Sequence, residues 1–148
     1  MGYKNKYFDG LKANVCGEFY PYIDHSCSKM ANELDVDREE RFNAQRAESG
    51  GYDERVTWSL NTYMTEQIYT WLKMYLEYGG GFVDLTFHKF DIDGTEMCEK
   101  EVIEEVIRCL EFYLTNWDSF DKELEEKSME LAKRGYKLLG IVLPSLWW

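Results

Sequence analysis

Two stretches of the sequence repeat apolar residues every three or four positions, which is the period of a helix that buries one face. One stretch begins near Thr57 and stops at the glycines of residues 79–81, and the other begins near Thr95. Because strands alternate every second residue, this period predicts two amphipathic helices rather than a sheet. The apolar positions are Leu60, Met64, Ile68, Trp71, Leu72 and Tyr75 in the first stretch, and Val102, Ile103, Val106, Ile107, Leu110, Tyr113 and Leu114 in the second.

The remaining segments complete a small helical fold. A third helix is predicted between a connection at residues 116–119 and Pro144, which ends it. An extended segment at residues 82–88 and a turn at residues 91–94 predict a minor β-hairpin. Residues 1–30 have no sustained hydrophobic period, and residues 31–48 favour a weakly held, solvent-facing helix. The buried face of the third helix is expected to carry Phe120, Leu124, Leu131, Leu138 and Leu139.

We therefore expect a mainly α fold, a small bundle of three principal helices with an irregular N-terminal arm and a minor β-hairpin. A chain of 148 residues has the size of one ordinary domain. We expect residues 1–148 to form a single domain, in which residues 1–50 are the irregular arm and weak helix and residues 51–148 are the helical core.

The charge of the chain argues against several functions. It carries 28 acidic residues against 17 Lys and Arg, a net charge of −11. Proteins that bind nucleic acid concentrate Lys and Arg on the phosphates, so we expect no direct nucleic-acid partner. No apolar run approaches the roughly 20 residues that cross a bilayer, and the first residues lack the apolar stretch of a signal peptide. We therefore expect a cytoplasmic protein that does not bind membranes.

The acidity is concentrated in residues 91–126, which hold 13 acidic residues and only three basic ones. In the third helix, i,i+4 pairs offset it, namely Glu123 with Lys127, Lys122 with Glu126, and Glu130 with Arg134. The second helix is less balanced. Glu104 pairs with Lys100 and Arg108 at this spacing, but Glu101 and Glu105 repel each other and Glu111 has no partner. This acidic ridge is either a solvated face or a surface that binds a basic partner, and it comprises Asp91, Asp93, Glu99, Glu101, Glu104, Glu105 and Glu111.

The motifs of common enzymes are missing from the sequence. It contains no nucleophile elbow, phosphate-binding glycine loop or dinucleotide fingerprint, and its two histidines, His25 and His88, lie in no catalytic motif. We expect a protein that is not an enzyme and needs no cofactor. Cys16, His25 and Cys27 offer sulfur and nitrogen ligands, but their spacing differs from the paired ligands of common zinc sites. We expect reduced thiols and no metal there.

Residues 51–60 open on a glycine-aromatic pair, Gly51 and Tyr52, followed by Asp53 and Trp58, and the sequence closes on Leu146-Trp147-Trp148. In this order the chain resembles a group of small, uncharacterised proteins from bacteriophages and prophages, over roughly residues 50–148. Asn61 stands where that group often has an aspartate. The resemblance implies a phage protein in the cytoplasm of a bacterial host, and the group has no assigned activity.

These observations favour a phage accessory protein that binds and inhibits a host nucleic-acid-handling or defence protein, as anti-CRISPR proteins do. The acidic ridge would imitate phosphates, and the partner would be a host protein with a basic surface. One alternative is a protein that sequesters a cyclic nucleotide through Arg38, Arg41, Arg55 and Trp58. Another is a non-enzymatic component of phage assembly, or scaffold, that forms homo-oligomers.

Overall fold

The computed structural model describes residues 6–8, 35–57 and 60–147, which belong to two compact units. The described residues up to Met64, apart from residues 6–8, fall in the first unit, and residues 6–8 and 65–147 fall in the second. The expectation of a single domain stays a prediction.

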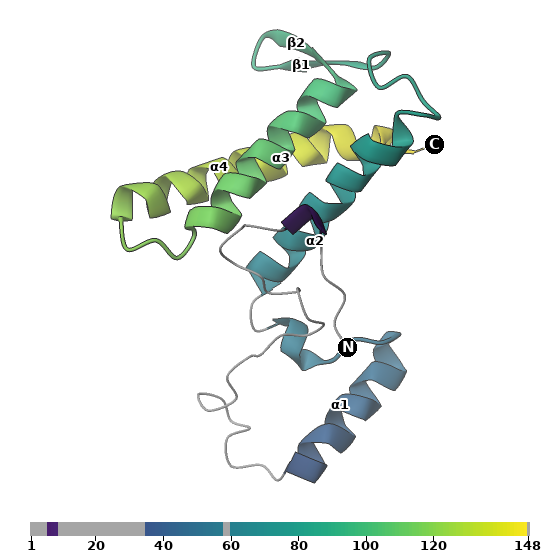
Figure 1. Cartoon of the computed structure of the whole chain (residues 1–148), viewed down its shortest axis with the longest axis vertical. Coiled ribbons are helices and arrows are strands. Elements are labelled where there is room, and N and C mark those ends of the chain that lie inside the picture. The colour runs from purple at the N-terminus through teal and green to yellow at the C-terminus, as the bar shows by residue number, and fades with distance from the viewer. Residues whose placement is uncertain (1–5, 9–34, 58–59, 148) are drawn as a thin grey trace. The chain divides into compact units, whose positions relative to one another are not determined.

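The first unit contains a helix within the segment, residues 31–48, for which the sequence predicted one. Helix α1 spans Asp35–Ser49 (Figure 1), and a 3-10 helix covers Glu54–Thr57. Gly50 and Gly51 end α1 with positive φ angles of 76° and 113°, which L side chains rarely adopt. The described residues therefore form four α-helices, which are the three principal helices of the prediction and the weaker helix expected in residues 31–48. The expectation of a largely solvent-facing helix fits α1, in which Phe42 is buried and Val36 is exposed.

Helices α3 (Glu99–Asn116) and α4 (Lys122–Val142) form the centre of the second unit. They lie side by side and run in opposite directions (Figure 1). All seven apolar positions predicted for the stretch after Thr95 are buried on α3, which confirms that helical face. They pack in one core with residues of the other elements, namely Tyr69, Leu72, Ile92, Ala132, Leu138 and Val142.

A glycine sets how closely α4 approaches α3. A Cβ atom on Gly135 would lie 3.0 Å from Cys109 Cβ and 3.2 Å from Leu110 Cδ2. Gly140, five residues further along α4, has no atom within 4 Å of the same position. Gly135 is therefore a contact point between the two helices, whereas Gly140 is not.

The predicted buried face of α4 is wrong at its N-terminal end. Phe120 precedes the helix and is fully exposed, and 37% of the surface of Leu124 is exposed. Asp121 caps the helix by accepting hydrogen bonds from the backbone of Glu123 and Leu124. The C-terminal end agrees with the prediction, since α4 ends at Val142 and Pro144 lies in the next 3-10 helix, Leu143–Ser145.

Helix α2 spans Leu60–Met74 and continues as a π-helical turn over Tyr75–Gly79. Its predicted apolar stripe is only partly buried, because Leu60, Met64 and Trp71 are exposed. The buried face is rotated toward Tyr69 and Leu72 and includes polar residues that a hydrophobic period does not reveal, Thr62, Thr65 and Glu66. The Thr65 hydroxyl, for example, forms a hydrogen bond with the hydroxyl of Tyr136.

The predicted hairpin is present, with a different extent. Strands β1 (Lys89–Ile92) and β2 (Thr95–Cys98) pair antiparallel, with Ile92 opposite Thr95. The predicted helix start at Thr95 is wrong, because Thr95–Cys98 form β2 and α3 begins at Glu99. Asp93 and Gly94 form the two-residue turn with φ angles of 53° and 84°, the backbone signs of the turn that fits the twist of a hairpin.

Candidate functional site

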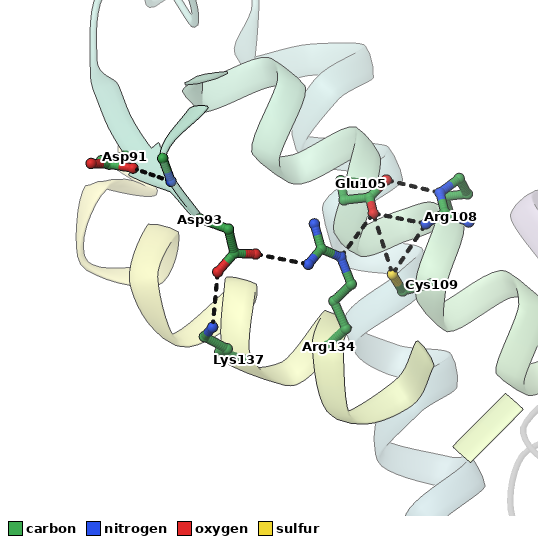
Figure 2. Close-up of polar contacts among 8 residues, drawn as sticks. Asp91, Asp93, Glu105, Arg108, Cys109, Arg134 and Lys137 are labelled. Carbon is green, nitrogen blue, oxygen red and sulfur yellow. Dashed lines mark hydrogen bonds and ion pairs between the residues drawn. The ribbon is translucent and has the colours of Figure 1, made fainter. Parts of the chain in front are cut away.

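The hairpin turn contributes two residues of the predicted acidic ridge. Asp91 accepts a hydrogen bond from the backbone N–H of Gly94 at 2.8 Å, which stabilises the turn. Asp93 forms ion pairs with two side chains of α4, Arg134 at 3.0 Å and Lys137 at 3.3 Å (Figure 2). Hydrogen bonds from Arg134 and then Lys137 lower the pKa of Asp93. Both carboxylates are exposed, but each is already committed to the local structure.

Glu105 joins α3 to α4 through a second set of ion pairs. Its carboxylate accepts two hydrogen bonds from Arg108, at 2.7 and 2.8 Å, and one from Arg134 at 3.1 Å (Figure 2). The bonds from Arg108, helped by Arg134 and opposed by burial, lower the pKa of Glu105 from 4.5 to about 2. Arg134 thus bridges the hairpin turn and α3. This network is a structural junction rather than a free acidic surface.

We expect Glu105→Gln to lower the free energy of unfolding at pH 7 by about 1–2 kcal/mol, because it removes the ion pairs with Arg108 and Arg134. Solvent screens part of the network, which limits the loss to this size. The native pKa lies below the unfolded value of 4.5, so this contribution is complete above that pH and is lost as the pH falls toward 2. Urea unfolding of both proteins at pH 7 and at pH 2.5 should therefore show a difference that shrinks on acidification. A constant difference would contradict the assignment. Glu104→Gln is the matched control and should change stability by less than about 0.5 kcal/mol.

The other predicted ridge residues lie in different environments on α3. Glu101 is exposed and its carboxylate accepts the backbone N–H of Cys98 at 2.7 Å, which caps the helix. Glu104 is exposed and lies 3.8 Å from Lys100, which confirms that pair, while Glu111 is half-buried. Glu99 is buried, with 2% of its surface exposed, so the prediction that it lies on an exposed ridge is wrong. The seven residues do not form one open acidic face.

A more open acidic surface lies at the start of α4, which we call the acidic α4 surface. Residues 118–130 contain six acidic and two basic residues. Among the described residues, none of the carboxylates of this surface on α4 forms an ion pair, and Lys127 lies over the ring of Phe112 instead. Phe120 stands fully exposed beside them. The acidic α4 surface consists of Asp121, Glu123, Glu125, Glu126 and Glu130.

The residues predicted for a nucleotide site belong to the first unit. Arg41 pairs with Glu54 at 3.0 Å, and the neighbouring Arg46 pairs with the buried carboxylate of Asp53 at 2.6 Å. These pairs hold the segment after Gly51 against α1. Arg38 is half-buried on α1, and Trp58 and the side chain of Arg55 lie outside the described residues.

The cavity beside that segment does not favour an anionic ligand. It measures about 400 Å³ and its described lining contains three carboxylates and no arginine or lysine: Gln45, Glu48, Ser49, Tyr52, Asp53, Glu54 and Thr57. A nucleotide phosphate would have to displace Glu54 from Arg41 to reach a cation there. The geometry gives the nucleotide-binding alternative no support.

The residues of the candidate metal site fall in a part of the chain that the structure does not describe. Cys16, His25 and Cys27 lie outside the described residues. Within the described ranges, no group of three or more His, Cys, Asp and Glu side chains is placed to hold a metal ion, and no helix is long and apolar enough to cross a membrane. Cys98 and Cys109 are free, buried thiols, and burial raises the pKa of Cys109. The expectation that the protein needs no metal or cofactor stays a prediction.

A second cavity, of about 200 Å³, lies in the second unit at the start of α3. It is lined by residues of the π-helical turn, of the segment before β1 and of the C-terminal part of the described chain. The sequence did not predict that these segments meet. Glu99 is the one residue of the predicted ridge that lines it. A helical wheel does reveal part of this arrangement, since Glu99 lies three and four positions before the buried Val102 and Ile103 and therefore on the apolar face.

Comparison of the chain with protein-family models, with curated proteins and with solved structures gives no match. The resemblance to phage proteins therefore stays a prediction.

Proposed function

We propose that the chain is a phage protein that binds and inhibits a host nucleic-acid-handling or defence protein and carries out no chemistry itself. The observation that supports this function most is the acidic α4 surface, whose carboxylates have no ion-pair partner within the described chain and stand beside a fully exposed Phe120. A surface of this kind complements the basic groove that a nucleic-acid-binding protein offers to phosphates.

We propose that the contact lies on α4 rather than on α3. Most carboxylates of the predicted ridge cap a helix, stabilise a turn, join two elements or are buried. Using these groups to bind a partner would break interactions of the native fold. The acidic α4 surface has no such commitment apart from the cap formed by Asp121, so its charges are available to steer a basic protein and fix its orientation.

Charge reversal tests the proposed function directly. The combined substitution Glu123→Lys, Glu126→Lys and Glu130→Lys should weaken binding to a purified host nucleic-acid-binding effector at least tenfold and relieve its inhibition. The matched control is Asp37→Lys, Glu40→Lys and Glu48→Lys, which changes the net charge equally on exposed positions of α1. The control should bind within about twofold of the original chain. Binding is measured by titration at low and moderate salt, because the electrostatic contribution falls as salt rises.

Two outcomes would contradict the proposal. If both triple variants lose affinity equally, total charge and not the acidic α4 surface governs binding. If the unaltered chain forms no complex with any host nucleic-acid-binding effector at low salt, the function itself is wrong. Light scattering over a range of concentrations tests the scaffold alternative, which requires oligomers that grow with concentration.

Phe120→Ala should leave the fold intact and weaken the complex at least tenfold. Phe120 is fully exposed, so its loss creates no cavity and should change the free energy of unfolding by less than about 0.5 kcal/mol. An aromatic side chain buried at the centre of an interface commonly contributes more than 1 kcal/mol to binding. Thermal unfolding and titration against the same effector measure the two quantities. Unchanged affinity would show that the partner contacts the charges without Phe120.

A further inference from the structure

The cavity at the start of α3 is lined by acidic and aromatic residues. Its lining includes the carboxylate residue Glu99, the rings of Tyr75, Phe87 and Trp147, and the polar residues His88 and Ser145. A volume of about 200 Å³ is smaller than the 300–1,000 Å³ of typical sites for drug-sized ligands, and it is large enough for the end of one long side chain.

Glu99 is buried without a cation. Only 2% of its surface is exposed, and its Oε1 accepts a hydrogen bond from the Tyr75 hydroxyl at 3.1 Å. Within the described chain, its Oε2 has no hydrogen bond and no Lys, Arg or His forms an ion pair with it. The position of Glu99 in the first turn of α3 offsets part of the cost through the helix dipole. Burying a carboxylate is unfavourable unless a cation or further donors compensate it.

The groups around Glu99 suit a positively charged donor. Burial, followed by the charge of Glu99, raises the pKa of Tyr75 to about 12, so its hydroxyl stays protonated and donates to the carboxylate. Phe87 and Trp147 line the cavity and are largely exposed, with 73% of the surface of Trp147 accessible. Aromatic faces attract ammonium and guanidinium groups, and Asp84 adds a second carboxylate to the lining.

We propose that this cavity binds a primary ammonium or guanidinium group. Resting on the proposed function, the group is a Lys or Arg side chain of the basic partner, which enters between Phe87 and Trp147 and reaches Glu99. The cavity then supplies a specific anchor that the acidic α4 surface, with its solvated charges, does not. A free polyamine offers the same chemistry, so the experiment separates the two sources.

The test uses the full chain and four small probes. These are N-acetyl-lysine methylamide, N-acetyl-arginine methylamide, spermidine, and the uncharged N-acetyl-norleucine methylamide. Titration followed by the backbone amide resonances of Tyr75 and Glu99 should show saturable shifts with the charged probes and none with the norleucine derivative. Glu99→Gln, which keeps the shape of the side chain, should weaken this binding at least tenfold. Glu104→Gln, which removes an exposed carboxylate from the same helix, should bind as the original chain does.

Trp147→Ala provides a second variant that is safe for the fold because Trp147 is mostly exposed, and it should also weaken the charged probes about tenfold. A lysine or arginine derivative that binds more tightly than spermidine supports a partner side chain, and the reverse order overturns that assignment in favour of a free amine. Absence of saturable binding by any charged probe, or equal binding of norleucine, overturns the site. If Glu99→Gln binds the partner normally while the α4 charge-reversed variant does not, this inference fails and the proposed function stands.

Discussion

Leu110→Ala should lower the free energy of unfolding by about 3–4 kcal/mol, the largest loss that we expect from a single truncation in this chain. Leu110 has no exposed surface, lies in the core of the second unit and contacts the point where Gly135 brings α4 against α3. Removing three carbon atoms there leaves a cavity that two long helices cannot collapse to fill.

Leu124→Ala is the matched control for this measurement. It removes the same atoms from α4, where 37% of the leucine surface is already exposed, and it should cost less than about 1 kcal/mol. Urea unfolding of the full chain, with the same slope against urea for each variant, gives both values. A cost below about 1 kcal/mol for Leu110→Ala would mean that the contact between α3 and α4 is not the main source of stability in the second unit.

The sequence predicted best those features of the fold that depend on the hydrophobic period of a single helix. All seven apolar residues predicted for the face of α3 are buried because they share a strict helical period, whereas the buried Glu99 and Cys109 were not predicted for that face. Helix α2 was recovered with its buried face misplaced. The hydrophobic period of α2 assigned Trp71 to the buried face, but Trp71 is exposed and Tyr69 is buried instead. The sequence of one helix does not distinguish an apolar residue that covers the core from one that lines a surface groove, as Trp71 does.

The charged residues were harder to place because ion pairs depend on tertiary neighbours. Glu130 and Arg134 have the spacing of a helical pair, which made the start of α4 look neutralised. In the structure Arg134 turns to Glu105 and Asp93 instead, which leaves Glu130 without that partner. The same exchange commits Glu105 and Asp93 of the predicted ridge. The sequence located the acidity but not the helix that presents it.

Gly135→Val should destabilise the protein by about 3 kcal/mol, although valine favours helices more than glycine does. The first added carbon would lie 3.0 Å from Cys109 Cβ, an atom fixed to the backbone of α3, and 3.2 Å from Leu110 Cδ2. The leucine can rotate, but the cysteine Cβ moves only if α3 moves. The branched side chain must therefore push the two helices apart, and the packing of Leu138 and Val142 further along α4 opens with them.

Gly140→Val isolates this steric effect because it makes the same change on the same helix at a position with no atom within 4 Å. It should alter the free energy of unfolding by less than about 0.5 kcal/mol, with helix propensity favouring the variant. The difference between the two variants thus reports the cost of separating α3 from α4. The double variant Gly135→Val with Leu110→Ala should cost less than the sum of the single changes, because the truncated leucine gives the valine room. Additive losses would show that Cys109, and not Leu110, carries the whole clash.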